Sequence, residues 1–324
     1  MNTKLVYSVV GNKNNNYVEE ACVSAWSAKY YNHSVITIFA CDKETYVYIQ
    51  EYKKRADIFT AIDEVICIEV PEDLDSKAKS RWIKTSARKY VDGNILCIDT
   101  DTVVCSDLSD LDNLNIQIGA VQDYHCNYLT AFYRQRIENK VFDIYNYKLD
   151  SNTTRYFNSG VIYSKDCKEA HDLYEKWHIY WQEGLEKGID RDQFALVRAC
   201  ADIGINEIDD NYNCMVRASI QYLYTAKILH FFNSGWGGDS ISPFFSGEIY
   251  KDIKKDGVIS QKNVERILNC KSMFSSPSIV FDMEESQLVL SPAFKLLTFW
   301  FRSKKKTFNL FNLLSRGILK LSGL

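Results

Sequence analysis

Two aspartates, Asp99 and Asp101, stand one residue apart where an apolar run ends. Ligands of open α/β sheets bind beyond the carboxyl ends of the strands, so both carboxylates can face one cleft if Thr100 bends the chain out of the sheet. Carboxylate oxygens are hard ligands that favour Mg²⁺ or Mn²⁺, ions that are commonly shared with a substrate's phosphates. Aspartates are also common turn residues, so this spacing alone is weak evidence for a metal site. The motifs elsewhere in the sequence must support it.

The segments before this pair alternate between apolar and amphipathic. We expect strands at 4–10, 34–40, 65–70 and 94–99, and helices at 17–31, 43–59 and 76–91. Strands separated by helices of this length imply right-handed crossovers and a mostly parallel sheet. Gly11 follows the first strand, but the G-x-G-x-x-G pattern is absent, so a dinucleotide site lacks its main support.

The later segments carry further polar residues at their ends. We expect strands at 117–123, 156–164 and 226–232, and helices at 129–149, 167–187 and 191–203. The polar residues are Asp123, Asn158, Ser159, Asp192, Gln193 and His230. Taken alone, a histidine beside two phenylalanines is more often a hydrogen-bonded core residue than a ligand.

Four motifs occur in an order and spacing that resemble glycosyltransferase family 8. They are Asp99-Thr100-Asp101, Asn158-Ser159-Gly160, Asp192-Gln193 and His230, within residues 4–238. That family includes glycogenin and the bacterial lipooligosaccharide galactosyltransferases. The resemblance implies the GT-A fold, an α/β fold with a mixed, mostly parallel central sheet flanked by helices. It also implies retaining transfer of a hexose, galactose or glucose, from a UDP-sugar to a cell-surface glycan or glycolipid such as lipooligosaccharide.

The resemblance also implies roles for individual residues. Asp99, Asp101 and His230 would bind Mn²⁺ (or Mg²⁺), and Asp192 and Gln193 would be the catalytic pair, the first binding the sugar and the second stabilising the transition state. A bridging cation is suited to a diphosphate leaving group, whose charge grows in the transition state. The expected donor-binding residues are Val10, Gly11, Arg81, Lys84, Asp99, Thr100, Asp123, Asn158, Ser159, Asp192 and Gly235. Val10 and Gly11 follow from topology, because they end the first strand.

The phosphate-binding segment departs from the family pattern. The family has a lysine after the histidine, whereas the segment 233–238 is glycine-rich and has none. Backbone N–H groups around Gly235 could replace the lysine. Alternatively, Arg81 and Lys84 could, since they share one helical face with Arg88.

Two other functions fit part of the pattern. Asp99 could be the nucleophile of a haloacid dehalogenase-like, magnesium-dependent phosphatase, with Asp209 and Asp210 as its acidic pair. Such a phosphatase leaves the three later motifs unexplained. The chain could also be an inactive sugar-nucleotide binding module.

Charge is distributed unevenly along the 324 residues. Residues 290–324 contain seven basic residues and no acidic ones, which leaves 32 basic and 42 acidic residues elsewhere. An acidic body argues against nucleic-acid binding. The basic tail has apolar residues at helical spacing in 308–321, and its apolar run at 296–301 is far shorter than the ~20 residues that span a bilayer. We therefore expect it to lie on an anionic membrane surface.

These observations predict three parts and a location. Residues 1–240 form the catalytic domain, 241–289 a helical part of the same domain, and 290–324 the tail. No basic, apolar leader follows Met1, so we expect a cytoplasmic protein at the inner face of the cell membrane. The ten cysteines are scattered singly, without a C-x-x-C pair, and we expect them to be reduced.

Overall fold

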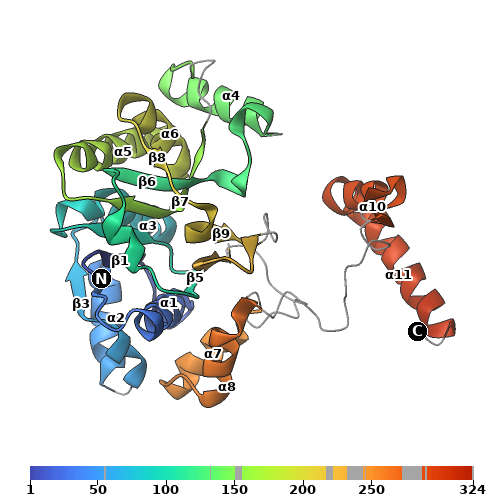
Figure 1. The fold of residues 1–324 in the computed structure, drawn as a ribbon, viewed down its shortest axis with the longest axis horizontal. Helices are drawn as coiled ribbons and strands as arrows, with labels where there is room; N and C mark the ends of the chain where they lie inside the picture. The colour runs from blue at the N-terminus through green and yellow to red at the C-terminus, as the bar shows by residue number, and fades with distance from the viewer. Residues whose placement is uncertain are drawn as a thin grey trace. The chain divides into compact units, whose positions relative to one another are not determined.

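A computed structural model describes most of the chain as two units, residues 1–271 and 272–324. The described residues are 1–54, 56–131, 133–149, 155–216, 222–231, 244, 246–271, 287–288 and 290–322. Figure 1 shows both units, and each is described by itself.

The first unit is built on a seven-stranded sheet of order β3-β2-β1-β4-β7-β6-β8. Its strands are β1 (Lys4–Val9), β2 (Thr37–Cys41), β3 (Glu64–Cys67), β4 (Ile95–Ile98), β6 (Ile118–Gln122), β7 (Phe157–Ser164) and β8 (Asn206–Glu207). Strands β3, β2, β1 and β4 are parallel, β7 is antiparallel to both of its neighbours, and β6 pairs parallel with β8. The sheet is therefore mixed and mostly parallel, as predicted.

Helices connect these strands and cover the sheet (Figure 1). They are α1 (Tyr17–Tyr31), α2 (Lys43–Lys53), α3 (Ser76–Ser86), α4 (Arg134–Tyr145), α5 (Lys168–Glu186) and α6 (Asp192–Asp202). Helices α3, α5 and α6 share one apolar core with β4 and β7. Every residue of β7 is buried, because this strand lies in the middle of the sheet.

Helix α4 is shorter than the predicted 129–149. The Asn127 side chain accepts a hydrogen bond from Leu129 N at 2.9 Å, which stabilises a separate 3-10 turn before the helix. At the other end Asn146 has φ 49°, a left-handed conformation that ends helices. The predicted helix 43–59 is likewise shorter, since α2 ends at Lys53 and a 3-10 turn follows at Asp57–Ala61.

A second, three-stranded sheet has the order β5-β10-β9. Its strands are β5 (Thr102–Val104), β9 (Cys214–Met215) and β10 (Ile228–His230). Strand β10 runs antiparallel to β5, with His230 opposite Thr102. Since β4 ends at Ile98 and β5 begins at Thr102, the residues 99–101 form the link between the two sheets.

Further helices lie in both units. Helices α7 (Glu248–Asp256) and α8 (Gln261–Leu268) belong to the first unit, and α10 (Pro292–Ser303) and α11 (Lys305–Leu321) to the second. In the second unit the Trp300 and Phe311 rings lie 6.0 Å apart, so α10 and α11 contact each other. Among the helices that the structure describes, none is long and apolar enough to cross a membrane. All ten cysteines are free thiols.

Candidate active site

The link between the two sheets brings two carboxylates and an imidazole together. His230 Nε2 lies 3.3 Å from Asp101 Oδ1 and 3.8 Å from Asp99 Oδ2. The ligand atoms of these three residues all lie within 4.8 Å of one another. The three expected metal ligands therefore converge, although the chain separates His230 from the aspartates by more than a hundred residues.

Main-chain hydrogen bonds hold this arrangement in place. Asp99 N donates to Gly160 O of β7 at 2.8 Å, and Phe231 N donates to Asp101 O at 2.9 Å. The Thr102 hydroxyl donates to Asp99 O at 2.9 Å. The link is therefore fastened to β7 on one side and to β10 on the other, and the chain does leave the large sheet at Thr100.

Gly160 leaves the space in which the His230 imidazole packs. A Cβ atom at Gly160 would lie 2.2 Å from His230 Cε1 and 2.7 Å from His230 Nδ1. The space beside Gly160 is filled by the histidine ring, which is only 2% exposed.

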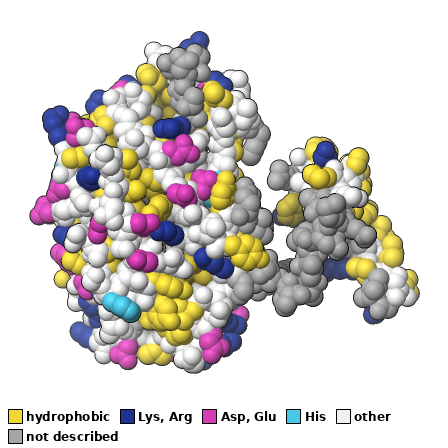
Figure 2. Space-filling model, viewed as in Figure 1, with side chains coloured by type: hydrophobic (Ala, Val, Ile, Leu, Met, Phe, Trp, Pro, Cys, Tyr) yellow, Lys and Arg dark blue, Asp and Glu magenta, His cyan; other side chains and the backbone are white. Residues whose placement is uncertain are grey.

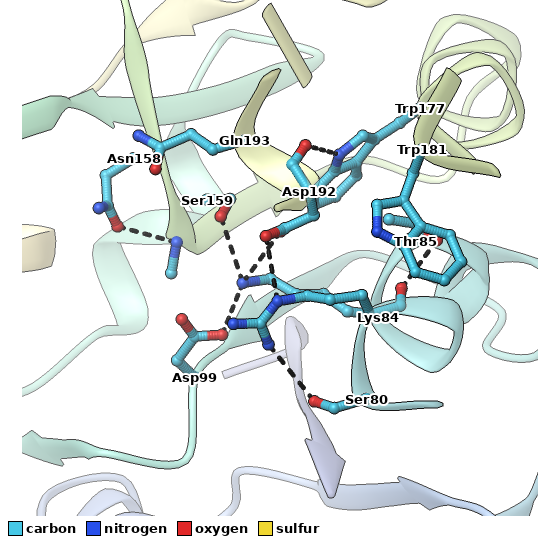
Figure 3. Close-up of polar contacts among 12 residues, drawn as sticks. Ser80, Lys84, Thr85, Asp99, Asn158, Ser159, Trp177, Trp181, Asp192 and Gln193 are labelled. Carbon is cyan, nitrogen blue, oxygen red and sulfur yellow. Dashed lines mark hydrogen bonds and ion pairs between the residues drawn. The ribbon is translucent and has the colours of Figure 1, made fainter. Parts of the chain in front are cut away.

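Lys84 of α3 connects the metal-ligand candidates to the other predicted residues (Figure 3). Its Nζ atom lies 2.7 Å from Asp99 Oδ1, 3.4 Å from Ser159 Oγ and 3.6 Å from Asp192 Oδ2. The lysine is 4% exposed, so these carboxylates, rather than water, compensate its charge.

Asp192 lies at the start of α6 and faces two cations. Arg81 Nε lies 3.1 Å from its Oδ1, and Trp177 Nε1 donates to its main-chain oxygen at 2.8 Å. Burial by itself would raise the pKa of this carboxyl, but Lys84 and Arg81 outweigh burial and hold the pKa below its ordinary value. Arg88, from the same predicted basic face, instead pairs with Asp166 at 2.8 Å.

Asp123, Asn158 and Gln193 form a neighbouring polar group. Asn158 Nδ2 donates to Asp123 Oδ1 at 2.9 Å, and Gln193 Nε2 donates to Phe157 O at 3.1 Å. Burial raises the pKa of Asp123, and hydrogen bonds from Asn158 and Gln193 partly oppose that effect. Two of the motifs predicted from sequence therefore meet at Asp123.

Val10 and Gly11 follow β1, which is the neighbour of β4. Gly11 N donates to the Thr45 hydroxyl at 2.9 Å, and a Cβ atom at Gly11 would lie 2.9 Å from Val18 Cγ2. The hydroxyl of Thr100 reaches Glu20 Oε2 of α1 at 3.4 Å. The aspartate link therefore contacts α1 through Thr100, whereas Gly235 lies outside the described residues.

Sequence reasoning missed three residues at this site. Glu20 contacts Thr100, and Tyr17 has its pKa raised by burial and by the charges of Glu20 and Asp101. Asn213 Oδ1 lies 3.0 Å from His230 Nδ1, within hydrogen-bond distance. Tyr17 and Glu20 could have been found from their place in the first turn of the helix that follows β1, since helices after parallel strands begin at the ligand edge. Asn213 carries no such signal.

The donor set fits a hard divalent cation. Two carboxylates and one imidazole nitrogen are ligands that manganese and magnesium accept, and an imidazole favours manganese of the two. The site contains three carboxylates and two cationic side chains. The carboxylates are Asp99, Asp101 and Asp192, and the cations are Lys84 and Arg81, so the net negative charge favours a bound cation.

The fold is that of the GT-A sugar-nucleotide transferases, with an Asp-Asp-His group at the carboxyl edge of its sheet. The galactosyltransferase LgtC, solved with donor and acceptor sugar analogues, is similar over 78% of this chain and 95% of its own, with a TM-score of 0.50 and 15% identity. An active-site mutant of LgtC has a TM-score of 0.52 at 13% identity, with the same coverage.

The bifunctional glycosyltransferase WbbM has a TM-score of 0.50 at 13% identity, over 81% of this chain and 50% of its own. No family model and no curated protein matches the sequence. These similarities confirm the predicted fold and, at the level of the fold, the resemblance to glycosyltransferases.

Proposed function

We propose that this chain is a retaining glycosyltransferase that moves a hexose, galactose or glucose, from a UDP-sugar to a cell-surface glycan such as lipooligosaccharide. The observation that carries the proposal is the convergence of Asp99, Asp101 and His230 beside the buried Lys84, in a GT-A fold. A nucleotide-sugar donor has a diphosphate leaving group, and such a site combines cation ligands with a fixed positive charge.

Asp99, Asp101 and His230 would hold the divalent cation. A bound cation neutralises the charge that develops on a diphosphate as the glycosidic bond breaks. Lys84 adds a positive charge next to Asp99, and its ion pairs with Asp99 and Asp192 set its position. Such preorganised charge stabilises a transition state without a cost of reorganisation.

The remaining residues would bind and orient the sugar. The lowered pKa of Asp192 keeps it a carboxylate near neutral pH, so it can accept hydrogen bonds from sugar hydroxyls. Asn158 and Ser159 add neutral hydrogen-bonding groups on β7, and Asp123 accepts a hydrogen bond from Asn158. Gln193 follows Asp192 on α6 and offers an amide to the reacting centre. Tight positioning by such groups can lower a barrier by several kcal/mol, roughly 7–11 kcal/mol at most.

The proposal also includes where the enzyme acts, which is a membrane surface. Residues 290–324 would attach the enzyme reversibly to an anionic membrane surface at the inner face of the cell membrane, next to a lipid-linked acceptor. Apolar residues of α11 such as Leu314 and Ile318 are 59% and 64% exposed, and residues 290–324 contain seven basic residues and no acidic ones. Exposed apolar area combined with basic residues is what binds anionic lipid.

The proposal is tested by adding UDP-sugars to the full chain. With Mn²⁺ and lipooligosaccharide acceptor, we expect UDP release from UDP-galactose or UDP-glucose, and a UDP-sugar-dependent rise in melting temperature. The Asp101→Asn variant should lose both effects, because it removes one cation ligand. Asp172→Asn, at a solvent-facing position on α5, is the matched control and should behave like the wild type.

Three results would contradict the proposal. Phosphate release from phosphomonoesters with Mg²⁺ would favour the phosphatase, and UDP-sugar binding without turnover across an acceptor panel would favour an inactive binding module. Retention is tested separately, by nuclear magnetic resonance assignment of the product anomer, and an inverted product would reject it.

A further inference from the structure

A chain of buried side-chain amides joins His230 to Asp123. His230 Nδ1 lies 3.0 Å from Asn213 Oδ1, and Asn213 Nδ2 donates to Asn158 Oδ1 at 2.9 Å. Asn158 Nδ2 in turn donates to Asp123 Oδ1 at 2.9 Å. A continuous path of hydrogen bonds therefore runs from one candidate cation ligand to the Asp123 carboxylate.

A backbone group fixes the direction of every bond in this path. Gly160 N can only donate, and it lies 2.8 Å from the Asn158 side chain, so the atom that it meets must be the amide oxygen. The Asn158 nitrogen then faces Asp123. The second group that meets the Asn158 oxygen must also be a donor, which makes it the Asn213 nitrogen. Asn213 therefore presents its oxygen to His230.

This orientation determines which nitrogen of His230 carries the hydrogen. An amide oxygen can only accept, so His230 Nδ1 must be the donor of that bond. In the neutral ring the lone pair is then on Nε2, and Nε2 is the nitrogen that lies 3.3 Å from Asp101. The amide path thus prepares the ring to bind a cation from the side of the aspartates.

Asn213 has little freedom to move or to be replaced by water. Its side chain is 0% exposed, and it ends the 3-10 turn Asp210–Asn213 directly before β9. Its main-chain oxygen lies 2.7 Å from His125 Nε2. Loss of either of its two side-chain bonds would leave a buried polar group unsatisfied.

We propose that Asn213 is a positioning residue of the cation site. It holds His230 in the tautomer whose Nε2 atom binds the cation, and through Asn158 it couples the cation ligands to Asp123. Groups that hydrogen-bond to a ligating histidine typically change metal affinity about 10–100-fold when they are mutated. The proposal rests on the cation role of His230 in the proposed function, and it does not require that sugar is transferred.

Direct Mn²⁺ binding to the full chain, measured by electron paramagnetic resonance, tests the proposal. Asn213→Leu removes the acceptor for His230, and we expect Mn²⁺ affinity to fall about 10–100-fold. Asn213→Asp keeps an oxygen that accepts from Nδ1 but cannot donate to Asn158. We therefore expect this variant to bind Mn²⁺ nearly as tightly as the wild type, while its thermal shift with UDP-sugar decreases. Nitrogen-15 spectra of histidine-labelled wild type should show His230 with its hydrogen on Nδ1.

Asn32→Leu is the matched control, because Asn32 is also a buried amide with both of its groups in hydrogen bonds, to Ala28 and Leu108. It should leave Mn²⁺ affinity unchanged. Wild-type affinity in a folded Asn213→Leu variant would overturn the proposal. If that variant does not fold, a tenfold or larger loss of affinity in Asn213→Asp, or a hydrogen on Nε2 of His230 in the wild type, would overturn it. Normal Mn²⁺ binding without sugar transfer would contradict the proposed function alone.

Discussion

Gly160 determines how closely the His230 imidazole can approach β7. The ring occupies the volume of a missing side chain, and the main-chain oxygen of the same glycine accepts the hydrogen bond that fixes Asp99. One residue therefore positions both a carboxylate and the imidazole of the proposed cation site.

Gly160→Ala should displace His230. The new Cβ atom would lie 2.2 Å from Cε1, far inside contact distance, so the ring must move away from β7. We expect Mn²⁺ affinity to fall about tenfold or more, by calorimetry, since histidine geometry controls affinity. At Gly204 a Cβ atom would meet nothing within 4 Å, so Gly204→Ala is the matched control. Unchanged Mn²⁺ affinity in Gly160→Ala would show that His230 is not a ligand.

The sequence predicted site residues that stand at the ends of recognisable strands and helices. Asp99 and Asp192 could be found in this way, because each sits next to a segment with clear apolar periodicity. Asn213 could not, since its importance comes from Asn158 and His230, which approach it only in three dimensions. The role of Gly160 was missed for the same reason, because its neighbour in space is far away in sequence.

At the scale of elements, α7 is fastened to the segment that follows β1. Lys254 Nζ donates to Asn12 O at 3.2 Å and also contacts Asn15 O. The same atom lies 3.3 Å from Glu19 Oε2 of α1, a side chain that is fully buried. Burial raises the pKa of Glu19 to about 7, although Lys254 opposes the effect. This junction supports the edge at which Val10 and Gly11 follow β1.

Glu19→Gln should change how stability depends on pH. Because the pKa of Glu19 is higher in the folded chain than the ordinary 4.5, protonation of Glu19 stabilises the fold. That contribution is complete below pH 4.5 and is lost as pH rises through about 7. It is on the order of 3 kcal/mol at most. The variant lacks this dependence, so its melting temperature relative to the wild type should rise between pH 5 and pH 8.

Differential scanning calorimetry of both proteins across this pH range measures the difference. Glu44→Gln, at an exposed position in α2, is the control and should show a constant offset from the wild type. A constant offset for Glu19→Gln as well would contradict the raised pKa of the buried glutamate.

Long elements were predictable from the sequence and short ones were not. The bounds 17–31 of α1 match the prediction, because the helix is long, with 15 residues. Strands β5 and β9 have three and two residues, too few to show a period. They exist because β10 supplies hydrogen-bond partners from a distant part of the chain.

At the scale of the whole molecule, the second unit exposes many apolar side chains. Figure 2 shows hydrophobic side chains on the visible face of this unit. In α11 no described residue is buried, and Leu310, Leu313 and Leu321 are 60%, 66% and 90% exposed. Exposed apolar surface of this kind is unusual in a soluble unit and marks an interaction site.

Deleting residues 290–324 should abolish sedimentation with vesicles that contain anionic lipid, while Mn²⁺ binding by the remaining chain is unchanged. Replacing Lys304, Lys305 and Lys306 with glutamine in the full chain separates charge from apolar contact. Each lysine near an anionic surface contributes ~1 kcal/mol, so the triple variant should bind about 100-fold more weakly. Because the attraction is screened by salt, wild-type binding should weaken towards that of the variant as ionic strength rises. Lys262→Gln, at an exposed position in α8, is the control for loss of charge in the first unit. Sedimentation of the truncated chain like the wild type would show that residues 290–324 do not bind the membrane.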